Sequence, residues 1–318
     1  SKKTSDCPDQ TPPAGYVPVS TASEAIAVIK TKIKISKAQM VYLMNTPEAL
    51  NLVYSLVYNN PSEEDKNFAL AMIDALKDEG VVDMKYRVIL DPTFSSNPRL
   101  MEVYTQLGGS AIFQSYLKKF DSNFSIADLN LSADNQFSVN FPENVKSQAV
   151  TLTPQNSLIK IVINNDASLS SNIFKFPKII TPIVLVHEMM HAEINRILLK
   201  CSKLPHVNPQ NMTDSQWVAH LKSMENNFPL LFEYYEKYQL ETSTPTDFQH
   251  EYIVAKYRNV IKEILKQYDN NSHTEEFYVT LSWFGLKGTA AWNNLSVEQQ
   301  TQINTSLQNI YKNEPYFN

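Results

Sequence analysis

Residues 181–200 read TPIVLVHEMMHAEINRILLK, and this stretch decides the fold. It has no glycine, and no proline after Pro182, and its long run of apolar residues predicts one buried helix. Pro182 suits the first helical position, where its missing N–H costs nothing, and Thr181 is expected to cap the helix. Lys200 then lies near the C-terminal end of the helix, which favours cations.

The predicted helix contains His187, Glu188 and His191 in the order His-Glu-x-x-His. Residues four apart lie one turn above each other on the same face of a helix, so both imidazoles can bind one metal ion. Zinc takes histidine nitrogens at about 2.0–2.1 Å. Glu188 flanks that point, where a general base takes a proton from a metal-bound water. The alternative is a buried helix that contains two histidines by chance, which would bury imidazoles and a carboxylate at a cost.

This motif resembles that of the zincin metallopeptidases, and the sequence HEMMHA at residues 187–192 is most similar to the SprT-like peptidases. The resemblance implies a Zn²⁺ ion held by His187 and His191, with Glu188 as the general base for hydrolysis of peptide bonds. It also implies a peptide or protein substrate, and a catalytic domain in which a small sheet lies beside the motif helix.

Other subfamily patterns do not extend to this chain. A metzincin would continue the motif with glycine and histidine where this chain has Ile194 and Ile197. The Asn-Glu-x-x-x-Asp pattern of thermolysin-like enzymes has no match, and the His-Gly signature that follows in SprT-like peptidases is missing. The third metal ligand is therefore open.

His250 is the first candidate for that third ligand. The positions that share its face of the helix predicted over 247–269 are apolar, so His250 is expected to point towards the core. A third histidine would leave the fourth position of a zinc site for water. His220 is an alternative, and Glu225 or Glu251 would make a gluzincin-like site. Without a metal, His250 would be a core histidine or a helix cap.

The remaining parts of a hydrolytic site are not assigned by the sequence. Tyr252, Tyr257, Tyr278 and His273 are candidate donors to the oxyanion of a tetrahedral intermediate, and nothing chooses among them. Glu193 lies on the side of its helix away from the two motif histidines, so it is a poor candidate for orienting them.

The composition describes an ordinary globular protein. Of 318 residues, 43% are hydrophobic and 19% charged, and only 6 are glycine, which argues against glycine-rich phosphate loops. A formal net charge of −5 predicts no broad basic surface for nucleic acid, and no apolar run reaches the roughly 20 residues of a membrane span. Two cysteines, Cys7 and Cys201, do not make a disulfide framework.

The first residues, SKKTSDCPDQTPPAGYVPVS, are polar and rich in Pro, Ser and Thr, which predicts a flexible tether over residues 1–21. The segment is similar to the stretch that follows the lipid-bearing cysteine of bacterial lipoproteins. It indicates an extracytoplasmic protein, secreted or held by a lipid anchor upstream of residue 1. The alternative is an arbitrary start of the chain.

The rest of the chain predicts an α+β fold that is mostly helical. Residues 22–83 read as an N-terminal helical region, and residues 84–318 as a zincin-like metallopeptidase domain. Strands are expected at 84–90, in the segment FSIADLNLS, and most clearly at 157–164, which reads SLIKIVIN. We expect the last of these to be the sheet edge beside the motif helix, where an extended peptide could pair with it; a purely structural strand is the alternative.

The sequence therefore predicts a zinc-dependent metallopeptidase. Two other functions stay open: a zinc hydrolase with a non-peptide substrate, and a non-catalytic surface binding protein with a vestigial zinc site. An intact glutamate at position 188 argues against the second, because a binding module does not need a general base.

Overall fold

The protein is described here as a computed structural model. The structure describes residues 21–120, 127–155, 157–202, 213–234 and 247–313. The predicted tether lies outside these residues except for Thr21, so the tether and the extracytoplasmic location remain predictions. Contacts divide the chain into two units between Asp78 and Glu79.

The first unit is helical, as the sequence predicted. Its helices are α1 (Ala22–Lys32), α2 (Lys37–Asn45), α3 (Pro47–Val57) and α4 (Glu63–Lys77). The helix starts follow local rules: the Ser62 side chain accepts from the backbone N–H of Asp65, and Pro47 occupies the first turn of its helix. Apolar side chains such as Val53, Phe68 and Met72 are buried between these helices. Packing of the apolar faces of these amphipathic helices accounts for the fold of this unit.

The boundary between the units differs from the one expected at residue 83. Strand β1 (Val81–Asp83) pairs antiparallel with β2 (Val88–Leu90), so these residues belong to the second unit. The strand expected at 84–90 is confined to its last three residues, because a turn at 84–87 joins β1 to β2.

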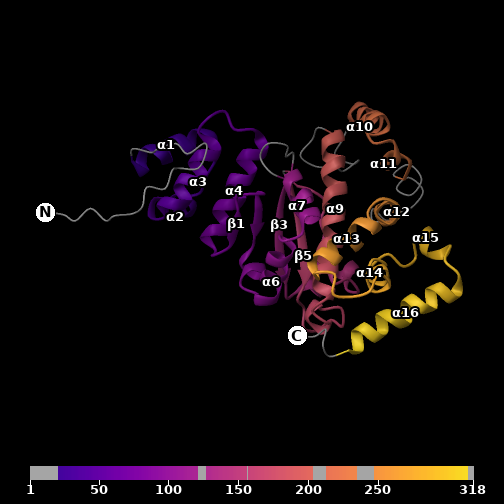
Figure 1. Ribbon diagram of the computed structural model, residues 1–318. Coiled ribbons are helices and arrows are strands. Elements are labelled where there is room, and N and C mark those ends of the chain that lie inside the picture. The colour runs from indigo at the N-terminus through magenta and orange to yellow at the C-terminus, as the bar shows by residue number, and fades with distance from the viewer. Residues whose placement is uncertain (1–20, 121–126, 156, 203–212, 235–246, 314–318) are drawn as a thin grey trace. The chain divides into compact units, whose positions relative to one another are not determined.

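The second unit contains a five-stranded mixed sheet with the order β1-β2-β3-β5-β4 among the described residues (Figure 1). Strand β3 (Asp128–Asp134) is parallel to β2 and to β5 (Leu158–Asn164). Strand β4 (Ala149–Thr151) pairs antiparallel with β5 and forms one edge of the sheet. The α+β class with mostly helical content is thereby confirmed.

The clearest predicted strand is confirmed but is not the edge. Ile159, Ile161 and Ile163 of β5 are fully buried, as their alternation predicted, while Lys160 is exposed. However, β5 lies between β3 and β4, so the expectation that it is the sheet edge was wrong, although it does pack against the motif helix as expected. The sequence did not reveal β4, because three residues are too few to show an alternating pattern.

Helices surround the sheet in the second unit. The shorter ones before the motif helix are α5 (Pro92–Ser95), α6 (Pro98–Leu107), α7 (Ala111–Leu117) and α8 (Phe137–Asn140). Those after it are α10 (Asp214–Asn227), α11 (Pro229–Tyr234), α12 (Asp247–Lys256), α13 (Arg258–Tyr268), α14 (Glu275–Leu281), α15 (Ala290–Asn293) and α16 (Val297–Lys312). Within the described residues, no helix combines the length and the apolar character that a membrane crossing requires.

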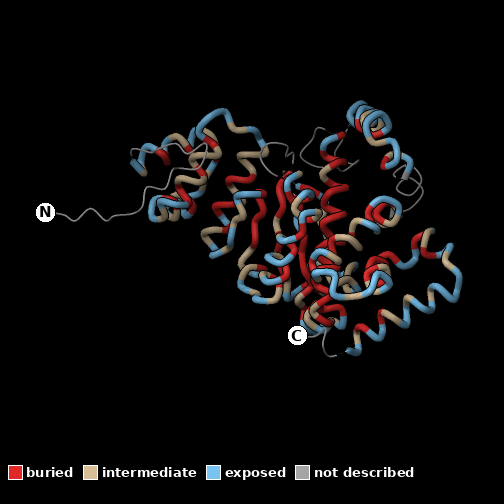
Figure 2. Tube along the Cα trace, viewed as in Figure 1, coloured by how far each residue is buried: buried red, intermediate tan, exposed pale blue. Residues whose placement is uncertain are grey.

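The motif helix α9 (Ile180–Ser202) packs against β4, β5, α10 and α13, and Figure 2 shows it buried along most of its length. The helix begins one residue before Thr181, which is therefore not its cap. Instead, the Thr181 hydroxyl accepts a hydrogen bond of 3.0 Å from Nε of Arg99, whose Nη2 also donates to the carbonyls of Phe176 and Pro177. The guanidinium thus anchors the turn that leads into α9.

The helix predicted over 247–269 is interrupted. It ends as α12 at Lys256 and resumes as α13 at Arg258. The ring of Tyr257, between the two, packs edge-on against those of Tyr116 and Tyr252. His250 lies on α12, so the apolar face predicted for one continuous helix is divided between α12 and α13.

A buried ion pair in the second unit gives a test of its packing. Nε of Arg87 lies 3.1 Å from Oδ1 of Asp128, and both side chains are only 2% exposed. We expect Arg87→Met to lower the free energy of unfolding by about 3–5 kcal/mol, because it leaves a buried carboxylate without the cation paired with it. Urea unfolding would measure this. The double variant Arg87→Met, Asp128→Leu should lose much less than the sum of the single variants; a loss below 1 kcal/mol in Arg87→Met would contradict the expectation.

Candidate metal centre

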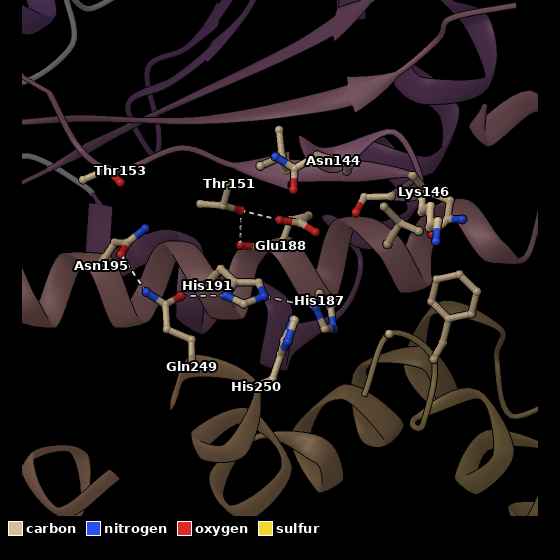
Figure 3. Close-up of a pocket in the computed structure, with 17 residues that line it drawn as sticks. Asn144, Lys146, Thr151, Thr153, His187, Glu188, His191, Asn195, Gln249 and His250 are labelled. Atoms are coloured by element: carbon tan, nitrogen blue, oxygen red, sulfur yellow. Dashed lines mark hydrogen bonds between the residues drawn. The ribbon is translucent and has the colours of Figure 1, made fainter. Parts of the chain in front are cut away.

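Three histidine side chains come together from two helices. His187 and His191 extend from successive turns of α9, and His250 comes from α12. One ring nitrogen of each lies within 4.8 Å of those of the others. The rings converge on one point, as Figure 3 shows, with centroids 4.9 Å apart for His187 and His191, 5.4 Å for His187 and His250, and 4.9 Å for His191 and His250.

The spacing fits one metal ion. Nε2 of His187 lies 3.1 Å from Nε2 of His191. Two ligands at about 2.0–2.1 Å from a tetrahedral ion lie roughly 3.3 Å from each other, so the observed separation is close to the value that a shared ion requires. Without an ion, the two facing nitrogens could form at most one hydrogen bond, in which one imidazole donates its N–H and the other accepts.

Burial keeps the two motif histidines neutral. Both His187 and His191 are 6% exposed. Burial lowers the pKa of His191 to about 4, and burial together with the neighbouring histidines lowers the pKa of His187 well below its usual value. The neutral imidazole is the form that binds metal ions, and it does so through a nitrogen lone pair.

A chain of two amides sets the tautomer of His191. Oε1 of Gln249 lies 2.6 Å from Nδ1 of His191, and Nε2 of Gln249 donates to Oδ1 of Asn195 at 3.1 Å. Because the Gln249 oxygen can only accept, Nδ1 of His191 carries the proton and its Nε2 presents a lone pair to the cluster. Gln249 is adjacent to His250 in the sequence, so one turn of α12 supplies a cluster histidine and the group that orients another.

The backbone of Gly285 packs closely against the ring of His187. Gly285 has φ +74°, in the left-handed region that favours glycine, and a Cβ built on it would lie 3.1 Å from Cε1 of His187. Any larger residue there would push the imidazole and strain the backbone. Nδ1 of His187 is buried and has no hydrogen-bond partner among the described residues, so packing on this backbone, and no hydrogen bond at Nδ1, holds that side of the ring.

Glu188 lies beside the cluster on the same helix. Its side chain is 8% exposed, and its Oε2 accepts a hydrogen bond of 2.6 Å from the hydroxyl of Thr151 on β4. Burial raises the pKa of Glu188 to about 7, against the opposing effect of the Thr151 hydrogen bonds. A carboxylate with a pKa near neutrality can both accept and return a proton.

The cluster opens into a pocket of about 340 Å³. Its walls are the edge strand β4 and the residues before it, the face of α9 that carries the motif, and the segment with Gly285. Figure 3 shows Lys146 towards one end of the pocket, Thr153 and Asn195 towards the other, and Asn144 above Glu188. The volume falls in the range of small-molecule and peptide side-chain sites, about 300–1,000 Å³.

The other candidate ligands do not join the cluster. Among the described residues, the group of three contains neither His220 nor the two glutamates. His220 is buried on α10, Glu225 is exposed on the same helix, and Glu251 accepts a hydrogen bond of 2.7 Å from the backbone N–H of Ala290. His250 is therefore the candidate that the structure brings to His187 and His191.

The candidate oxyanion donors lie elsewhere. Tyr252, Tyr257, Tyr278 and His273 are absent from the pocket lining. The Tyr278 hydroxyl donates to Oδ2 of Asp269 at 2.6 Å, and Nδ1 of His273 lies 2.5 Å from the same oxygen. Glu193, on the far side of α9, is bound to Lys119 and Arg196 and does not orient the cluster.

Three contributors were missed by sequence reasoning: Thr151, Gln249 and Gly285. For two of them the sequence contains a weak indication of a role in the site. Gln249 immediately precedes the candidate ligand His250 near a helix start, and Gly285 is one of only 6 glycines in the chain. For Thr151 there is none, because a threonine in a short polar stretch is ordinary.

Comparisons with protein-family models, curated proteins and solved structures found no match for this chain. The site is a cluster of two buried histidines and one half-buried histidine with a carboxylate next to it, compatible with a metal ion.

Metal content tests the cluster directly. We expect His187→Ala, His191→Ala and His250→Ala each to reduce the metal bound per chain from near one to near zero, because two imidazoles are too few for a stable site. Plasma mass spectrometry after dialysis would measure this, and the rise in melting temperature on adding metal should disappear with it. His273→Ala, outside the cluster, is the matched control. A variant of any cluster histidine with undiminished metal content would remove that residue from the site.

The role of Gln249 has its own test. Gln249→Leu should weaken metal affinity by about 10- to 100-fold, because Nδ1 of His191 loses the acceptor that holds its tautomer. Gln249→Glu keeps an acceptor at the same distance and should bind metal at least as tightly as the native protein. Competition titration with a chromophoric chelator would compare the two. Equal affinity of the Leu and Glu variants would contradict the proposed role.

Proposed function

We propose that this protein is a zinc-dependent metallopeptidase of the zincin type, nearest to the SprT-like peptidases. His187, His191 and His250 are the residues that hold Zn²⁺, and Glu188 is the general base. The observation that carries the proposal is that three converging imidazoles and a carboxylate with a raised pKa open into one pocket.

The donor set supports zinc as the metal. Catalytic zinc sites use three protein ligands and leave the fourth position for water, and neutral imidazoles are among the ligands zinc prefers. The pocket beside the three histidines provides space for that fourth ligand. When bound, zinc lowers the pKa of its water towards about 7 and polarises a carbonyl group.

Glu188 handles the proton in this proposal. Its carboxylate takes a proton from the attacking water and later returns it to the amine that leaves. A pKa of about 7 suits both steps, because proton transfer is most effective when the pKa of the group lies near the working pH. Burial, which raises this pKa, therefore favours the function.

The sheet edge supports a peptide as the substrate. In the described part of the chain, strand β4 is paired with β5 on one side only, and its residues line the pocket next to Glu188. An extended peptide can add to such an edge through backbone hydrogen bonds, which hold the scissile bond without regard to side-chain identity. A small non-peptide substrate would gain nothing from this edge.

Replacing the general base gives the principal test. We expect Glu188→Gln to keep its metal and to lose activity by roughly 10²–10⁴-fold, because the amide cannot take the proton. Cleavage of a mixed peptide library, read by mass spectrometry, would measure activity, and a chelator should abolish it in the native protein. Glu225→Gln, an exposed change on α10, is the matched control.

Two outcomes would overturn the proposal. If Glu188→Gln cleaves peptides as fast as the native protein, Glu188 is not the base. If the metal-loaded native protein cleaves no peptide in the library, the activity is not that of a peptidase, and a hydrolase of another substrate or a binding protein takes its place.

A further inference from the structure

The hydroxyl of Thr151 lies within reach of two acceptors on one residue. Its Oγ1 is 2.6 Å from Oε2 of Glu188 and 3.1 Å from the Glu188 backbone oxygen, as the dashed lines of Figure 3 show. A hydroxyl carries one hydrogen. The shorter contact has the length of a hydrogen bond to an ionised carboxylate, so the hydrogen goes to Oε2.

The two carboxylate oxygens of Glu188 are therefore not equivalent. Oε2 is anchored on the hydroxyl of Thr151, whereas no described side chain donates a hydrogen bond to Oε1. Glu188 lines the pocket, and Oε1 is not one of the buried side-chain atoms that lack a hydrogen-bond partner. Oε2 is therefore bound to strand β4, and Oε1 faces the pocket.

The anchor comes from a separate element of the fold. Thr151 is the last residue of the edge strand β4, and Glu188 lies on α9, 37 residues further along the chain. Figure 3 shows Glu188 between this strand and the three histidines. A glutamate side chain has three rotatable bonds, so without an anchor its carboxylate would sample several positions.

We propose that Thr151 is a positioning residue for Glu188: its hydroxyl holds one carboxylate oxygen so that the other faces the pocket, where it takes a proton from the attacking water. The inference rests on the proposed function of Glu188 as general base. A positioning role differs from a structural role, in which the hydrogen bond between Thr151 and Glu188 would only hold β4 against α9. A structural bond would change stability, whereas a positioning bond changes the rate of the chemical step.

The test compares variants that differ in one hydroxyl. Thr151→Val keeps the shape of the side chain and removes the hydroxyl, and Thr151→Ser keeps the hydroxyl. We expect kcat for peptide cleavage to fall about 10- to 100-fold in Thr151→Val, part of the roughly 10²–10⁴-fold supplied by a general base, with KM and metal content unchanged. Thr151→Ser should restore kcat to within about threefold of the native value, as expected if the hydroxyl alone acts. Thr151→Ala removes the same hydroxyl and replaces Thr151→Val if that variant does not fold.

A double variant shows whether Thr151 acts through Glu188. Because the anchor has no base left to position, Glu188→Gln, Thr151→Val should be no slower than Glu188→Gln alone. A multiplicative loss in the double variant would overturn the inference, as would native kcat in both Thr151→Val and Thr151→Ala.

The result separates this inference from the proposed function. If native protein cleaves peptides and Glu188→Gln does not, the function stands whatever Thr151→Val does, and native kcat in Thr151→Val then overturns the positioning role alone. Absence of cleavage by metal-loaded native protein overturns both.

Discussion

The cost of burying polar groups is the constraint on which this structure depends. Helix α9 passes through the core of the second unit, yet it carries two imidazoles and a carboxylate with exposures of only 6–8%. Such groups are tolerated in a core only when other polar groups or a metal ion satisfy them. Hydrogen bonds satisfy this requirement at Glu188 and His191, whereas His187 is held by packing; each of these partners also restricts how the side chains can point.

Those partners come from three directions. The edge strand β4 brings Thr151 to Glu188, helix α12 brings Gln249 to His191, and the segment after α14 brings the backbone of Gly285 to His187. Each motif residue is thus held by a different element of the fold. Precise placement of catalytic groups needs such support, because a side chain free to rotate spends little time in the reactive geometry.

Much of the architecture could be predicted from local patterns. Helix α4 begins where Ser62 indicates, and the alternating isoleucines of β5 mark a strand with one buried face. Position within the sheet could not be predicted, because the order of strands depends on pairing between distant segments. Strand β4 was missed because its three residues are too few to show an alternating pattern. Thr181, a good cap by its side chain, is bound instead by Arg99, 82 residues away.

The sequence by itself determined that His187 and His191 share one face of one helix with Glu188 flanking it, because the period of a helix acts over a few residues. It also limited the third histidine to a short set of candidates. Only the tertiary structure decided that His250 meets the other two, and that Thr151 and Gln249 contact Glu188 and His191 across 37 and 58 residues. Contacts of that length arise from how helices and strands pack, and no pattern in neighbouring residues encodes them.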